Sequence, residues 1–189
     1  MVLGTRHVFE FVSNEESIIR RNWKLGVWAC LVTGLVGCGQ NKFQQEVVTE
    51  KAAVKLVREF ADGGYEVITT EELKELLDGK TDMVLVDTMP YEASYAKAHM
   101  PGAVQFLFPK DPIDAWDDAG SDGKSQEAYA QLLGDDKDRL IVVYCGYVQC
   151  ARSHNGAYFA RQLGYTNVKR HAGGIFAWKG AGHATESAK

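Results

Sequence analysis

Two cysteines and an arginine lie within eight residues of one another in the carboxyl-terminal half of the chain. Cys145 follows the apolar run 140–144, Cys150 comes five residues later, and Arg152 two after that. The next segment has a helical pattern, so the loop lies where a strand passes into a helix. Because the thiolate is the nucleophilic form of cysteine, a helix amino terminus and a guanidinium would lower the pKa of Cys145 and cradle an anion. The pattern predicts a covalent reaction of Cys145 with an anionic sulfur or phosphorus compound.

Short apolar runs alternate with helical patterns along the chain, which predicts an α/β fold with a central, mostly parallel β-sheet flanked by helices. The run before Cys145 is the most apolar, so we expect it to be the central strand. Ligands of such sheets bind beyond the carboxyl ends of the strands, where the cysteine loop lies. The predicted strands are 65–68, 83–88, 103–106, 139–144 and 167–171.

The composition excludes several classes of protein. The chain has 189 residues, of which 46% are hydrophobic, and a net charge of −4. This suits one globular domain and argues against nucleic acid as a partner, since no basic stripe is present. The four cysteines do not form the paired spacing of a structural zinc site, so we expect no metal and no other cofactor.

The amino-terminal segment has the order of a bacterial export signal. Basic residues at 20, 21 and 24 precede the uncharged apolar stretch 25–36, which is shorter than the ~20 residues of a membrane-spanning helix. The sequence from Leu35 to Cys38 resembles a lipobox, in which the cysteine is lipidated and becomes the new amino terminus. This predicts a protein of the cell envelope that a lipid anchors to the membrane, at the outer membrane or facing the periplasm.

These patterns divide the chain into five segments. Residues 1–37 are predicted to be the signal peptide, 38–46 a tether, 47–64 an amphipathic helix, 65–183 the folded domain and 184–189 a carboxyl-terminal tail.

Two motifs carry a resemblance to rhodanese domains. "LVDTMPYEASYAKAHMPGAVQF" is similar to the front signature of that family, and "IVVYCGYVQCARSHNGAYFARQLGYTNVKRHAGGIFAWKGAG" is similar to its back signature. The resemblance implies a rhodanese-like fold in which Cys145 carries the transferred sulfur and Asp87 and His99 belong to the framework. It also implies that the loop after the central strand wraps the persulfide, through Gly146, Tyr147, Val148, Gln149, Cys150, Ala151, Arg152 and Ser153.

The chain departs from the family pattern at the loop. Six residues separate Cys145 from Arg152, whereas single-domain sulfurtransferases have four and the related phosphatases five. In addition, Met89 stands two residues after Asp87, where the family often has an arginine. Cys150 has three interpretations: a resolving thiol that attacks a persulfide on Cys145, a protective thiol that shields it as a disulfide, or a small loop residue that never meets it.

The favoured function is a sulfurtransferase that moves sulfane sulfur from a small anionic donor, such as thiosulfate or polysulfide, through Cys145. A thiol acceptor or a reductant protein would be its partner. Three alternatives remain open: a redox enzyme that uses Cys145 and Cys150 on a sulfur, selenium or arsenic oxyanion, a phosphatase-like enzyme, and a non-catalytic anion-binding module.

Overall fold

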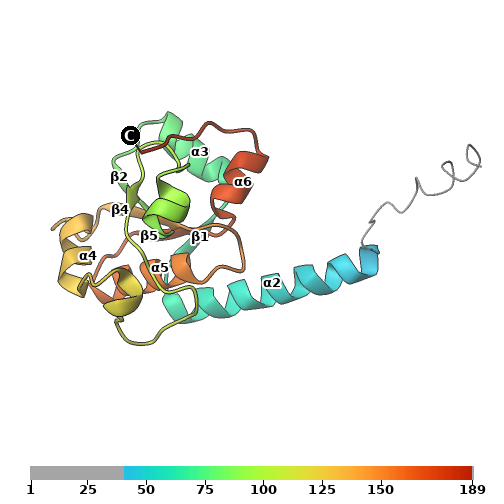
Figure 1. Ribbon diagram of the computed structural model, residues 1–189, viewed down its shortest axis with the longest axis horizontal. Coiled ribbons are helices and arrows are strands. Elements are labelled where there is room, and N and C mark those ends of the chain that lie inside the picture. Colours follow the sequence, from blue (N-terminus) through green and yellow to red (C-terminus); the bar gives the residue numbers. More distant parts are fainter. Residues whose placement is uncertain (1–40, 189) are drawn as a thin grey trace, which may run out of the picture. The chain divides into compact units, whose positions relative to one another are not determined.

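The computed structural model describes residues 41–188 of the chain (Figure 1). The predicted signal peptide, the lipobox and Cys38 lie outside these residues. In the described part, no helix combines the length and the hydropathy that a membrane crossing requires.

Five parallel strands form one sheet in the order β1-β5-β4-β2-β3. The third position belongs to β4, which confirms that the strand before the cysteine loop is central. All five of its residues are buried, as its continuous apolar sequence predicts for a strand covered on both faces. The strands are Glu66–Ile68 (β1), Met83–Asp87 (β2), Val104–Gln105 (β3), Leu140–Tyr144 (β4) and Val168–His171 (β5).

The helices are α2 (Lys42–Gly63), α3 (Thr70–Asp78), α4 (Gln126–Leu133), α5 (Arg152–Gln162) and α6 (Gly174–Gly180), with a π-helical turn at Tyr91–Tyr95 and a 3₁₀ turn at Ala119–Ser121. A capping box is present at the start of α3. Thr69 accepts a hydrogen bond from the amide of Glu72, whose side chain accepts one from the amide of Thr69. Gly79 caps the other end of the helix.

The sheet has two separate cores because successive side chains of a strand point to opposite faces. From β4, Ile141 and Val143 enter the core shared with α4 and α5. Leu140, Val142 and Tyr144 enter the core shared with α3 and α6. Packing in both cores holds β4 in place, and this fixes the position of the cysteine loop that follows its carboxyl end.

Helix α2 begins earlier than predicted. The segment 38–46 was expected to be a tether, but α2 starts at Lys42, where the Asn41 side chain accepts a hydrogen bond from the Phe43 amide and so caps the helix. The expected burial of an apolar face is also wrong. Val57 is 64% exposed, whereas Glu59 is only 7% exposed, because an ion pair rather than apolar packing joins this helix to the domain.

The carboxyl-terminal residues belong to the folded domain, contrary to the predicted tail at 184–189. Glu186 and His99 exchange backbone hydrogen bonds of 2.9 Å in both directions, and Trp178 donates to the Ala184 carbonyl at 2.7 Å. The segment therefore forms a short antiparallel bridge beside the front motif.

Burial of His171 predicts an acid-sensitive contribution to stability. Burial lowers the pKa of His171 to about 4, whereas an unfolded histidine has a pKa near ~6.5. Between these two pH values His171 binds a proton in the unfolded chain but not in the folded one. The free energy of unfolding therefore falls as the pH drops from about 6.5 to about 4. Wild type should lose about 3 kcal/mol more than His171→Leu across this range, measured by urea unfolding at several pH values. Equal slopes would contradict the assignment.

Candidate active site

The cysteine loop follows the carboxyl end of the central strand, as the sequence predicted. Cys145 comes directly after β4, and α5 begins at Arg152. Both Cys145 and Cys150 are buried free thiols. The loop therefore brings two reduced sulfurs together at the sheet edge where parallel α/β folds bind ligands.

The sulfur of Cys145 is enclosed by polar atoms of its own loop. Its Sγ lies 3.1 Å from the hydroxyl of Ser153, 3.3 Å from the carbonyl of Cys150 and 3.8 Å from the carbonyl of Tyr147. Carbonyl oxygens accept a hydrogen bond from a thiol but repel the negative charge of a thiolate. The Ser153 hydroxyl is the contact that can donate to a thiolate at this position.

The two thiols influence one another, and their pKa values move in opposite directions. The Cys145 thiol, the amides of Arg152 and Gly146 and the Arg152 charge together lower the pKa of Cys150 to about 6, against the effect of burial. Burial and the adjacent Cys150 raise the pKa of Cys145. The prediction that the helix terminus lowers the pKa of Cys145 holds only in part: the Ser153 amide and hydroxyl do lower it, but burial and the adjacent Cys150 outweigh them.

This coupling turns the two cysteines into one acid–base unit. Near pH 7 the pair carries a single proton, since Cys150 is ionised and Cys145 is not. Transfer of that proton from Cys145 to Cys150 generates a Cys145 thiolate without a histidine base. The interpretation of Cys150 as a loop residue that never meets Cys145 does not fit this geometry.

Replacement of Cys150 by serine should move the titration of Cys145. A serine hydroxyl does not ionise in this range, so Cys145 loses the adjacent anion. We expect the midpoint of its alkylation rate to fall below the wild-type value, because the adjacent Cys150 raises the pKa of Cys145 in the native pair. Iodoacetamide rates between pH 5 and 10, with the site located by peptide mass spectrometry, measure this. An unchanged midpoint would show that the two thiols titrate independently.

Arg152 does not face Cys145, although it was predicted to hold the donor's charge beside that residue. Its guanidinium donates a hydrogen bond to the Phe108 carbonyl, which anchors the preceding loop to α5. Its charge still acts on the site, because it helps to lower the pKa of Cys150. As the first residue of α5, Arg152 positions the helix start while its charge favours an anion nearby.

Neither Ser153 nor His154 caps α5. The helix has no side-chain cap; Ala151 occupies that position. Ser153 contacts Cys145 instead, and the His154 Nδ1 lies 2.9 Å from the Tyr65 hydroxyl. A backbone hydrogen bond closes the turn before the helix: the Cys150 amide donates to the Tyr147 carbonyl at 3.0 Å. The side chains of Ser153 and His154 can therefore make tertiary contacts instead of capping the helix.

Arg170 is the functional candidate that the sequence analysis missed. Its side chain is fully buried and donates to the Ser153 hydroxyl at 2.9 Å and to the Cys150 carbonyl at 3.1 Å. Arg170 lies on the same face of β5 as Val168, which packs in the core shared with α4 and α5. A cation therefore occupies a strand position that faces the core. A charge at an inward strand position must have buried partners, and that signal could have identified it.

The remaining predicted loop residues line the same turn. The Gly146 carbonyl accepts a hydrogen bond from the Phe176 amide, which joins the loop to α6. The Val148 carbonyl lies 3.5 Å from the Arg170 Nη2. Tyr147 is 49% exposed and stacks on Phe176, with ring centroids 5.6 Å apart. Gln149 is exposed and Ala151 is buried.

Asp87 and His99 lie in the framework of the front motif. Asp87 ends β2, accepts the Met89 amide at 2.9 Å and bonds to Tyr144, and burial raises its pKa to about 6. The His99 Nδ1 lies 2.9 Å from the Tyr95 carbonyl, and the two rings stack with centroids 4.0 Å apart. These contacts agree with a structural role for both residues. Among residues 41–188, no group of three acidic, cysteine or histidine side chains could hold a metal ion.

Comparison with solved structures finds the same fold. A thiosulfate sulfurtransferase from Pseudomonas aeruginosa superposes with a TM-score of 0.54 at 19% identity, over 73% of this chain and 23% of that one. A polysulfide-sulfur transferase homodimer from Wolinella succinogenes superposes with a TM-score of 0.48 at 15% identity, over 75% of this chain and 91% of that one. A possible tyrosine phosphatase from Rhodopseudomonas palustris superposes with a TM-score of 0.48 at 24% identity, over 71% of this chain and 93% of that one. A search of curated proteins finds no match.

The sequence also matches the model of the rhodanese-like domain over residues 69–181, which includes the front motif, all but the last residue of the back motif, strands β2 to β5 and the cysteine loop. The match covers more than half of the chain. The expectation from the two motifs is confirmed: this chain belongs to the rhodanese-like domain family.

Proposed function

We propose that the chain is a sulfurtransferase that moves sulfane sulfur through a persulfide on Cys145. The observation that carries the proposal is the pair of buried, reduced cysteines in the loop after β4, where Cys145 Sγ lies 3.3 Å from the Cys150 carbonyl. The name of the Pseudomonas structure, a thiosulfate sulfurtransferase, supports thiosulfate as a donor. A buried pair that ionises near neutral pH provides a nucleophile without metal or cofactor.

The first half-reaction begins with proton transfer from Cys145 to Cys150. The Cys145 thiolate then attacks the outer sulfur of thiosulfate, so that an Sγ–S bond forms while the sulfur–sulfur bond of the donor breaks. Sulfite leaves with the electron pair of that bond. The Ser153 hydroxyl, 3.1 Å from Sγ, can donate to the sulfur while it is anionic.

The second half-reaction passes the outer sulfur to an acceptor thiolate. A bond forms between the acceptor sulfur and the outer sulfur, the persulfide bond breaks, and Cys145 leaves as a thiolate. The acceptor then carries the persulfide and the enzyme returns to its starting charge. The positive charge of Arg152 and the α5 amino terminus favour the anionic donor and persulfide in both steps.

The second candidate function is thiol–disulfide redox chemistry, and the same pair of cysteines favours it. The Cys150 thiolate would attack Sγ of the Cys145 persulfide, forming a disulfide while hydrosulfide leaves with the electron pair. A reductant dithiol protein would then restore both thiols by disulfide exchange. A sulfur, selenium or arsenic oxyanion could replace the persulfide as the two-electron oxidant.

Intact-protein mass spectrometry of the reduced chain after exposure to thiosulfate or polysulfide separates the two functions. Sulfur transfer gives a mass gain of one sulfur atom. Redox chemistry gives the loss of two hydrogens, which dithiothreitol reverses. If neither product forms with any sulfur donor, the sulfurtransferase proposal is wrong and a binding or phosphatase-like role takes its place.

We also propose that the protein is exported and lipidated on Cys38, which would place the site in the cell envelope, where its disulfide could form. The ordered basic flank, apolar stretch and lipobox of the sequence support this. Incorporation of labelled palmitate into the full chain, compared with Cys38→Ala, tests it; equal labelling of both would count against lipidation.

A further inference from the structure

Helix α2 contributes a buried carboxylate to the back of the cysteine loop. The family match begins at residue 69, so α2 precedes it. Glu59 of this helix is only 7% exposed and lies 2.6 Å from Arg170 Nη1. Lys55, one helical turn earlier, also donates to Glu59. A carboxylate held between two cations loses its proton readily: their bonds lower the pKa of Glu59 although burial opposes them.

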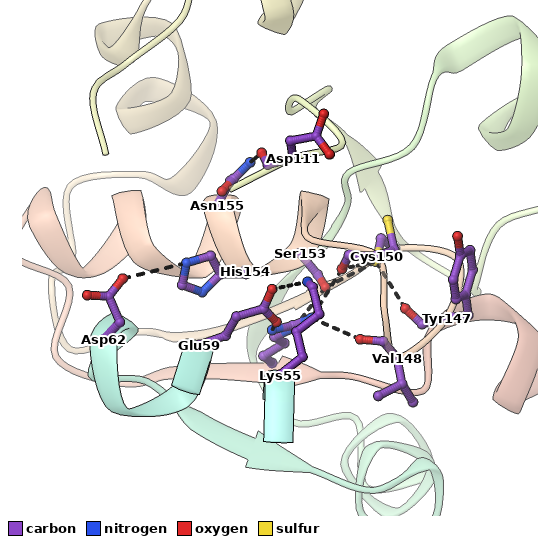
Figure 2. A network of polar contacts seen from close by, with 12 residues as sticks. Lys55, Glu59, Asp62, Asp111, Tyr147, Val148, Cys150, Ser153, His154 and Asn155 are labelled. Carbon is purple, nitrogen blue, oxygen red and sulfur yellow. Dashed lines mark hydrogen bonds and ion pairs between the residues drawn. The ribbon is translucent and has the colours of Figure 1, made fainter. Parts of the chain in front are cut away.

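Arg170 connects this carboxylate to the loop. Figure 2 shows Glu59 on the α2 side of the network and Cys150, Val148 and Ser153 on the loop side. The Arg170 guanidinium joins them, through bonds to Ser153 Oγ at 2.9 Å and the Cys150 carbonyl at 3.1 Å. The planar guanidinium of arginine is suited to holding several acceptors in one fixed geometry.

The bond to Ser153 determines which way its hydroxyl proton points. Arg170 Nε–H donates to the Ser153 oxygen, so the hydroxyl cannot donate back to it. The other close partner of that oxygen is Cys145 Sγ, at 3.1 Å. The hydroxyl is therefore oriented to donate to the sulfur, and this bond strengthens when the sulfur is a thiolate.

We propose that Glu59 is a positioning residue of the active site: it holds Arg170, which fixes the carbonyls of residues 148 and 150 and directs the Ser153 hydroxyl at Cys145. The inference rests on the proposed function for the reaction it serves. Its first consequences, thiol ionisation and loop order, exist without any sulfur donor. Helix α2 is on this account part of the catalytic unit rather than only a connection to the preceding segment.

The charges around the thiol pair make the test directional. The charges of Asp87 on β2 and Arg152 on α5 act on Cys150, Arg170 on β5 bonds to the Cys150 carbonyl, and Glu59 pairs with Arg170. If Glu59 acted only as a negative charge, its removal would favour the thiolate and lower the midpoint of thiol titration. If it acts by positioning, its removal frees Arg170, disorients Ser153 and raises that midpoint.

The test compares Glu59→Gln with Glu50→Gln in the full chain. Glu50 is an exposed carboxylate of the same helix, so the control removes the same charge without the buried contact. Two readouts are iodoacetamide rates at Cys145 and Cys150 from pH 5 to 10, and hydrogen exchange of the amides at 146–153. For Glu59→Gln we expect about tenfold slower alkylation at pH 6 and about tenfold faster exchange, the effect of losing one charge-assisted hydrogen bond.

Arg170→Lys is the second variant in case the first does not fold. A lysine keeps the positive charge but cannot hold Ser153 and two carbonyls at once, so the same two changes are expected. Wild-type thiol titration and loop exchange in a folded Glu59→Gln or Arg170→Lys would overturn the inference, and so would a lowered midpoint. Because neither readout uses a sulfur donor, failure of wild type to form a persulfide would reject the proposed function and leave this result standing.

Discussion

Cys145→Ser is expected to form no persulfide with thiosulfate or polysulfide and to lose sulfur transfer by at least about a thousandfold, as removal of a nucleophile does in other covalent enzymes. The serine hydroxyl fits the buried site, so the fold should remain, but it does not ionise near neutral pH and forms no persulfide. Cys150 is left with its lowered pKa partly reversed, because the hydrogen bond from Cys145 is its largest cause.

Mass spectrometry of the exposed protein and a steady-state assay with a small acceptor such as cyanide measure this loss. Cys150→Ser is the matched control: at pH 9 it should still gain one sulfur atom, because Cys145 can ionise there without its partner. A sulfur adduct that persists in Cys145→Ser and disappears in Cys150→Ser would transfer the carrier role to Cys150.

Gly174→Ala is expected to destabilise the protein by about 3 kcal/mol or more and to displace the cysteine loop. Gly174 has φ of +61°, and a Cβ there would lie 2.3 Å from the Cys145 carbonyl oxygen and 2.6 Å from the Gly146 carbonyl carbon. The backbone conformation costs an alanine about 1–2 kcal/mol, and overlap with backbone atoms adds about 1–3 kcal/mol. Relief of the overlap requires α6 to move from the loop, which breaks the bonds from Ile175 and Phe176.

Gly180→Ala is the control, since Gly180 ends the same helix and has no atom within 4 Å of an added Cβ. Its stability should change by less than about 0.5 kcal/mol. Urea unfolding gives the stabilities, and the pH midpoint of Cys145 alkylation reports displacement of the loop. Equal stability of the two variants would show that the close approach of α6 to Cys145 is not part of the fold.

Much of the fold could be predicted because it depends on local patterns. The buried strand β4 is a continuous apolar run, and the capping box of α3 is written in Thr69 and Glu72. The two signature motifs identified the family. The start of α2 was missed although its Asn41 cap is a local signal, whereas the carboxyl-terminal bridge of Glu186 could not be predicted, because it depends on pairing with the distant His99.

The sequence by itself determined the position of the site: Cys145 must follow the central strand, and Cys150 and Arg152 must lie in the loop after it. Only the tertiary structure decided what each group does there. Arg152 turns to the Phe108 carbonyl, the amides of Gly146 and Arg152 act on Cys150, and burial outweighs the Ser153 amide at Cys145. Spacing along the chain fixes which residues reach the sheet edge. The direction of each side chain, and so the pKa of each thiol, depends on contacts such as that of Arg170 with Glu59, which lies 111 positions away.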